Sequence, residues 1–196
     1  MKHRVAYFTV LSIAIPLLLR VIELWLAPIA ARILHISGIT AADTVLLGVS
    51  IIAALVCRSY GISPGFTTSN LKLDRRTVLL FFLVLLPTII RAVVTPVDIR
   101  GISFITTAFS EELMCRGVWF SLVRKNVESD KTAVLSYPVL LSSLFFIVWH
   151  IPFDLSAPSL FYVIVGIYSS LCLGLLREHS RSLYPGITAH VIKLLV

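Results

Sequence analysis

Seven long runs of apolar residues dominate this chain and limit the folds that are open to it. About 20 apolar residues cross a bilayer as an α-helix, and spanning segments are helices or closed barrels because lipid leaves peptide groups without hydrogen-bond partners. The runs are far longer than a barrel strand of about 10 residues. They cover residues 5–31, 39–57, 78–94, 102–122, 132–151, 160–176 and 183–196. We therefore expect an all-α membrane protein, a bundle of about seven transmembrane helices.

The composition supports this interpretation and shows no second domain. Hydrophobic residues make up 58% of the 196 residues and charged residues only 14%, whereas soluble domains have roughly a quarter charged. No internal repeat is visible, so residues 1–196 are expected to form one transmembrane domain, with N-terminal helices in 1–101 and the functional site in 102–196. The last run is short, and its end is the least defined part of the topology.

The basic residues indicate an orientation in the membrane. The net charge is +7, but there is no basic stripe, so nucleic acid is not an expected partner. With the N-terminus inside, the outer loops hold only Arg32 and Arg100. The inner segments then hold Lys2, Arg4, Arg58, Lys72, Arg75, Arg76, Arg124, Lys125, Lys131, Arg177 and Arg181. The positive-inside rule therefore predicts a multi-pass protein of the cell membrane with a cytoplasmic N-terminus.

Cysteines and one pair of charges in the first helix have structural explanations. Cys57, Cys115 and Cys172 have no repeated spacing, so they predict neither a disulfide framework nor a metal finger and are expected to be packing residues. Arg20 and Glu23 are three residues apart and are expected to compensate each other. Since they interrupt the first run, we expect an uncleaved helix rather than a signal peptide.

Ionisable residues near the middle of the fourth run are the first candidates for chemistry. Each charged group inside a span costs at least about 2.5 kcal/mol on insertion scales. Glu112 and Arg116 are four apart, on one helical face, and form a favourable ion pair. Glu111 lies about 100° further round the helix and is not matched by that arginine, so Glu111 is the candidate general base. Alternatively, both glutamates share Arg116 and a histidine in a purely structural polar cluster.

Two histidines complete the candidate set. His150 ends the fifth helix, one turn after Phe146, whose ring can pack against the imidazole and orient it. His190 lies inside the last apolar run. Singly, His150 is typical of an interfacial residue, and the alternative for His190 is a hydrogen bond to a neighbouring carbonyl group. Together, a glutamate base, a histidine that shares the water proton and a second histidine beside an oxyanion suffice for water attack on an amide.

These motifs resemble those of the CPBP family, named for CAAX proteases and bacteriocin-processing enzymes. The matching residues are Glu111-Glu112-x-x-x-Arg116, Phe146-x-x-x-His150, and Gly174-Leu175-Leu176-Arg177 followed by Ser182-Leu183 and His190. The resemblance covers Phe104 to the C-terminus. It implies an intramembrane endopeptidase of the glutamic type, related to the Ras-converting CAAX endopeptidase, with its active site inside the membrane.

By that resemblance, Glu111 activates water with His150, and His190 stabilises the oxyanion. Glu112, Arg116 and Phe146 are expected to form and hold the site. One position departs from the pattern: members typically have Asn or Asp four residues after the last histidine, and this chain has Leu194, which donates no hydrogen bond. The oxyanion site would then rest on His190 alone or use a donor elsewhere.

The expected substrate is a protein or peptide with a C-terminal membrane segment, as in family members that process sorting signals, and the other expected partner is membrane lipid. No cofactor is expected. The alternative is zinc held by Glu111, His150 and His190, which is disfavoured because no further carboxylate is expected to orient either histidine. Two other functions stay open: a proton-coupled transporter, and a non-catalytic membrane scaffold of the same fold. The cleavage motif and the oligomeric state are not predicted.

Overall fold

The computed structural model describes residues 2–35, 38–69, 71–94, 103–127, 135–150 and 160–195. Within these ranges the chain is helical and has no β-strand. Its elements are α1 (Lys2–Leu34), α2 (Gly38–Ser59), α3 (Arg75–Val94), α4 (Ser103–Glu112), the π-helix η1 (Leu113–Trp119), α5 (Phe120–Asn126), α6 (Tyr137–Trp149), α7 (Leu160–Ser180) and α8 (Tyr184–Leu195). The all-α prediction is confirmed for the described part of the chain.

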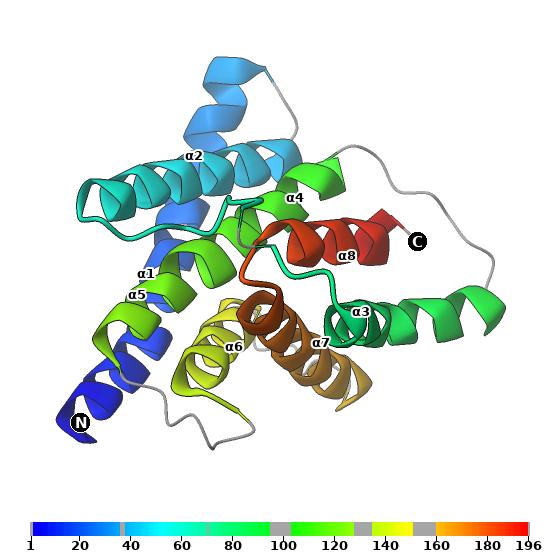
Figure 1. Cartoon of the computed structure of the whole chain (residues 1–196). Coiled ribbons are helices and arrows are strands. Elements are labelled where there is room, and N and C mark those ends of the chain that lie inside the picture. The colour runs from blue at the N-terminus through cyan, green and yellow to red at the C-terminus, as the bar shows by residue number, and fades with distance from the viewer. Residues whose placement is uncertain are drawn as a thin grey trace.

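The continuous rod formed by α4, η1 and α5 runs through the bundle (Figure 1). The α4 part contacts α2 and α8, and η1 contacts α2, α6 and α7. Helices α1 and α2 lie on one side of this rod, while α3, α7 and α8 pack together on the other. Side chains on α4 and η1 can therefore meet residues that are 54 to 78 positions later in the chain.

Two of the described helices are long and apolar enough to cross a membrane by themselves: residues His3–Leu34 and Ala41–Ser59. Their outer faces expose large apolar side chains such as Trp25 and Ile52, and α3 likewise exposes Phe82. By contrast, α8 has 12 residues, which at about 1.5 Å per residue covers roughly 18 Å of a core about 30 Å thick.

The fourth apolar run is not one regular α-helix. Its centre, Leu113–Trp119, is π-helical, and the Phe120 N–H donates to the carbonyl of Cys115, five residues earlier. Every residue of η1 is buried. Gly117 permits this packing, because a Cβ there would lie 3.1 Å from Leu183 Cδ1 and 3.3 Å from the Pro64 carbonyl oxygen. Such π-segments are rare and occur often at functional sites.

The fifth helix begins later than expected. Residues 132–134 lie outside the described residues, and Leu135 and Ser136 are not helical. The Ser136 hydroxyl instead accepts a hydrogen bond from the Val139 N–H, and proline occupies the first turn of α6. A capping serine followed by proline is a typical helix start, so the expected start at residue 132 is wrong for 135 and 136.

Two smaller predictions are confirmed. The free cysteines Cys57, Cys115 and Cys172 are all buried. Arg20 donates to both carboxylate oxygens of Glu23, at 2.9 and 2.8 Å. These groups need no functional explanation.

Candidate active site

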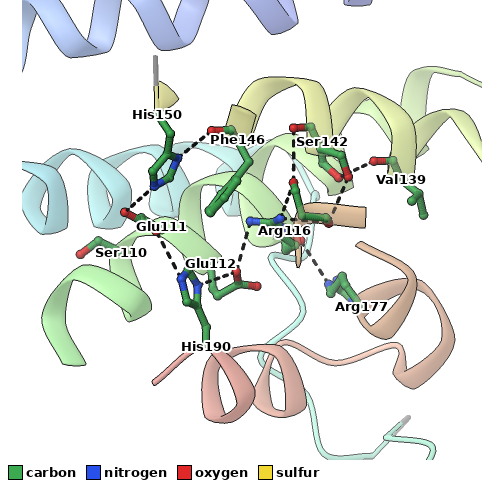
Figure 2. Close-up of polar contacts among 12 residues, drawn as sticks. Ser110, Glu111, Glu112, Arg116, Val139, Ser142, Phe146, His150, Arg177 and His190 are labelled. Atoms are coloured by element: carbon green, nitrogen blue, oxygen red, sulfur yellow. Dashed lines mark hydrogen bonds and ion pairs between the residues drawn. The ribbon is translucent and has the colours of Figure 1, made fainter. Parts of the chain in front are cut away.

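The structure brings all six predicted site residues into one cluster, contributed by α4, η1, α6 and α8. Figure 2 shows His150 and His190 approaching Glu111 from two sides, with Glu112 and Arg116 deeper in the bundle. The two glutamates, Arg116 and His190 are buried. The His150 side chain keeps 45% of its surface accessible, whereas that of Glu111 keeps 9%. The cluster therefore has an accessible side at His150. Its opposite, buried part around Glu112 and Arg116 is called the floor of the site.

Glu112 forms the floor of this cluster. Its Oε1 accepts from Arg116 Nη1 at 3.2 Å and from His190 Nδ1 at 3.0 Å. Its Oε2 has no hydrogen-bond partner among the described residues and lies 3.0 Å from where a Cβ on Gly186 would be. The predicted pair of Glu112 with Arg116 is confirmed, and the close approach of α8 to Glu112 favours glycine at position 186.

Arg116 links Glu112 to α7 and, through Ser170, to α6. Its Nη2 donates to the Ser170 carbonyl at 3.1 Å and to the Ser170 hydroxyl at 2.8 Å. The Ser170 hydroxyl in turn donates to the carbonyl of Ser143 on α6, and the Ser143 hydroxyl donates to the carbonyl of Ser170. The guanidinium also lies 4.3 Å from the centre of the Phe146 ring. A fully buried arginine is thus held by an anion, a serine and an aromatic face.

His150 is oriented by its own helix. Its Nδ1 lies 2.8 Å from the Phe146 carbonyl oxygen, and since a carbonyl only accepts, Nδ1 carries the hydrogen. The imidazole also packs on the Phe146 ring with centroids 4.2 Å apart, as the sequence spacing predicted. The unprotonated Nε2 of a neutral His150 then points toward Glu111 Oε1, 3.4 Å away.

His190 has an equivalent arrangement on the other side of Glu111. Its Nδ1 bonds Glu112, and its Nε2 lies 3.6 Å from Glu111 Oε2. Each histidine thus uses Nδ1 for a fixed bond and presents Nε2 to one oxygen of the same carboxylate. A carboxylate and two imidazole nitrogens at these separations can exchange a proton with a water placed between them.

One sequence expectation needs correction here. Glu111, which Arg116 was not expected to match, is approached by His150 and His190, as the proposed catalytic set requires. No carboxylate was expected to orient a histidine, but Glu112 holds His190. His190 therefore bonds a carboxylate rather than a backbone carbonyl.

Sequence reasoning missed Ser170 and Lys193. The Gly174-Leu175-Leu176-Arg177 motif lies at the end of α7, where Arg177 Nε donates to the Arg116 carbonyl at 3.2 Å. The side chain of Arg116 is contacted one turn before this motif, by Ser170. Lys193 lies one turn after His190 and interacts electrostatically with Glu111 and Glu112. Its proximity to His190 in the sequence was a signal that could have identified it.

An apolar cavity of about 570 Å³ lies apart from this chemistry. It is bounded by α2, the segment 61–67 and the junction of α4 with η1. Its lining contains Arg58 but no carboxylate or imidazole.

A metal site is not evident in the described part of the chain, where no group of three or more His, Cys, Asp or Glu side chains has a suitable arrangement. Glu111, His150 and His190, the alternative zinc ligands, are close together. Nδ1 is bonded to the Phe146 carbonyl in His150 and to Glu112 in His190, so that both Nε2 atoms face Glu111. Dependence on a metal stays an open prediction.

Comparison with known proteins identifies the family. A family model described as type II CAAX prenyl endopeptidase Rce1-like matches residues 77–194, more than half of the chain. The match begins in α3, earlier than the Phe104 at which the motif resemblance began, and includes the whole cluster around Glu111. No curated protein and no solved structure matches the chain. The chain therefore belongs to the Rce1-like family of type II CAAX prenyl endopeptidases, which are membrane proteases.

Proposed function

We propose that this protein is an intramembrane endopeptidase of the glutamic type, in which Glu111 and His150 activate a water molecule. The observation that carries the proposal is the position of the Glu111 carboxylate, whose oxygens lie 3.4 Å from His150 Nε2 and 3.6 Å from His190 Nε2. A water between Glu111 and His150 can lose its proton to this pair as its oxygen attacks a peptide carbonyl.

The remaining residues have separate roles in this mechanism. Attack forms the new C–O bond and places negative charge on the carbonyl oxygen, where protonated His190 donates from Nε2. Glu112 supports the positive charge of His190 from the opposite ring nitrogen. The C–N bond then breaks, and the proton taken from water passes to the departing amine. Arg116 and Phe146 hold Glu112, His150 and His190 in place.

The membrane part of the proposal rests on the distribution of polarity. Large apolar side chains are exposed on α1, α2 and α3, while Glu112, Arg116 and His190 are at most 2% exposed. An exposed apolar surface of this extent favours contact with lipid, and buried ionisable residues in apolar helices are typical of functional sites within membranes. We propose one multi-pass domain of seven membrane helices with a cytoplasmic N-terminus, in which α8 lies inside the bundle.

The proposed substrate is a protein that ends in a membrane segment, cut near that segment. With a cytoplasmic N-terminus, His150 and its accessible side face the outer leaflet, which suits a cleavage site between a short motif and a C-terminal helix. This orientation is tested by the variant His150→Cys: labelling by an impermeant thiol reagent from outside intact cells is expected, and labelling from the cytoplasmic side alone contradicts it.

The central test is Glu111→Gln, which keeps the shape of the side chain and removes the base. Glu178→Gln, the same change at a partly buried position on α7, is the matched control. We expect the Glu111 variant to accumulate an uncleaved precursor when membrane and secreted proteomes are compared, and the control to resemble the wild type. A scaffold would tolerate both changes, whereas a transporter would lose transport without any precursor accumulating. Purified protein that cleaves the precursor separates the protease from the transporter.

A further inference from the structure

Lys193 is a basic residue on the same helix as His190. It follows His190 by three residues on α8, and residues three apart lie on neighbouring parts of one helical face. The orientation of that face is known, because His190 points from it toward both glutamates (Figure 2). Lys193 is partly buried. Its charge interacts with those of Glu111, Glu112 and Arg116, and with that of a protonated His150.

Lys193 forms no ion pair with another side chain among the described residues. Glu112, which is fully buried, already accepts from Arg116 and His190, and no ion pair or hydrogen bond of Lys193 is found within the described ranges. A charge in a largely apolar helix is costly and calls for a partner or a purpose. An ammonium group that is attracted by two carboxylates but bonded to neither remains available to a ligand.

The proposed reaction has few hydrogen-bond donors for the oxyanion, and an ammonium group would supply one. The Nδ1 hydrogen of His190 is committed to Glu112, so His190 donates from Nε2 only when the ring is doubly protonated. Leu194, the next residue on this face, has no donor in its side chain. An oxyanion in a site of low dielectric is stabilised strongly by each positioned donor.

We propose that Lys193 is a catalytic residue whose ammonium group donates to the carbonyl oxygen of the scissile peptide bond as that oxygen becomes negative. The inference rests on the proposed function and adds a residue to it. Lys193 transfers no proton and forms no bond: as water oxygen bonds to the carbonyl carbon, the electron pair moves to the carbonyl oxygen and is held by the ammonium hydrogens. The pair returns when the C–N bond breaks.

The test is Lys193→Met, which keeps the length and apolar stem of the side chain and removes the charge. The probe is the precursor that accumulates in cells carrying Glu111→Gln, purified in detergent with the wild-type enzyme and its variants. We expect kcat to fall by about 10² to 10³ with KM little changed, which is the usual effect of removing one oxyanion donor. Lys193→Arg should stay within about tenfold of wild type, since the guanidinium also donates.

Rescue separates catalysis from structure. Adding Leu194→Asn to the Lys193→Met variant places a neutral donor beside the lost one and should recover at least about tenfold in kcat. Activity of Lys193→Met within threefold of wild type would overturn the inference, as would a rise in KM alone, or an equal loss in the methionine and arginine variants with no rescue. If the methionine variant does not fold, Lys193→Leu, which also lacks a donor, is measured in its place. An active Glu111→Gln enzyme would instead refute the proposed function.

Discussion

Replacing Arg116 by methionine tests whether the buried floor of the site holds the bundle together. The change removes the ion pair to Glu112 Oε1 and both hydrogen bonds to Ser170, and replaces the cation on Phe146 by an apolar chain. Because the Glu112 side chain is fully buried, it would be left with His190 as its hydrogen-bond partner. Removing one member of a buried pair costs about 3–5 kcal/mol, so we expect the free energy of unfolding to fall by this amount.

The assay is reversible unfolding in mixed micelles, followed by circular dichroism, with Arg124→Met as the matched control. Arg124 is exposed on α5, and its replacement should change the unfolding free energy by no more than about 0.5 kcal/mol. The double variant with Glu112→Gln should lose less than the sum of the single losses, by at least about 0.5 kcal/mol, as expected for residues in contact. A loss for Arg116→Met as small as for the control, or strict additivity, would refute the account of the floor.

Three further predictions follow from contacts elsewhere. Gly186→Ala should cost about 1–3 kcal/mol of stability and reduce activity, because its Cβ would lie 3.0 Å from Glu112 Oε2. The control Gly48→Ala, whose Cβ would have nothing within 4 Å, should be neutral or stabilising. Equal shifts in the thermal unfolding midpoint of the two variants would contradict this prediction. The Thr77 N–H and then His179 lower the pKa of Asp74 from 3.8 to about 2, so the stability that Asp74 adds is present above pH 3.8 and disappears as the pH falls through about 2. The unfolding midpoints of wild type and Asp74→Asn should converge over that range, and a constant gap would count against the pair. Protease activity should survive metal chelators, and its loss with recovery on adding zinc would favour the zinc alternative.

The interactions that could be predicted from the sequence are local ones. Glu112 with Arg116, Phe146 with His150 and Arg20 with Glu23 are all three or four residues apart, and helical geometry alone brings such residues together. The apolar runs likewise predicted where most helices lie, since burial or lipid contact requires apolar side chains whatever the detailed packing.

The interactions that could not be predicted depend on how helices pack. His190 meets Glu112 across 78 residues and Arg116 meets Ser170 across 54, and no single-sequence pattern states which helical faces touch. Small residues make these approaches possible: a Cβ on Gly174 would lie 3.1 Å from Val139. The π-helix also had no visible signal, because its backbone bonds are stabilised by the packing of its seven buried residues.

That π-helix means that the site depends on the number of residues as well as on their identity. A π-segment accommodates an additional residue in the turn, and removing one residue would favour a return to regular α-helix. Each residue of an α-helix turns the chain by about 100°. Deleting one residue of Leu113–Cys115 would thus shorten the spacing between Glu112 and Arg116 from four residues to three and disturb their ion pair, although every site residue would still be present. Insertions and deletions in this segment, which substitution scans do not sample, are therefore expected to be among the most damaging changes to the protein.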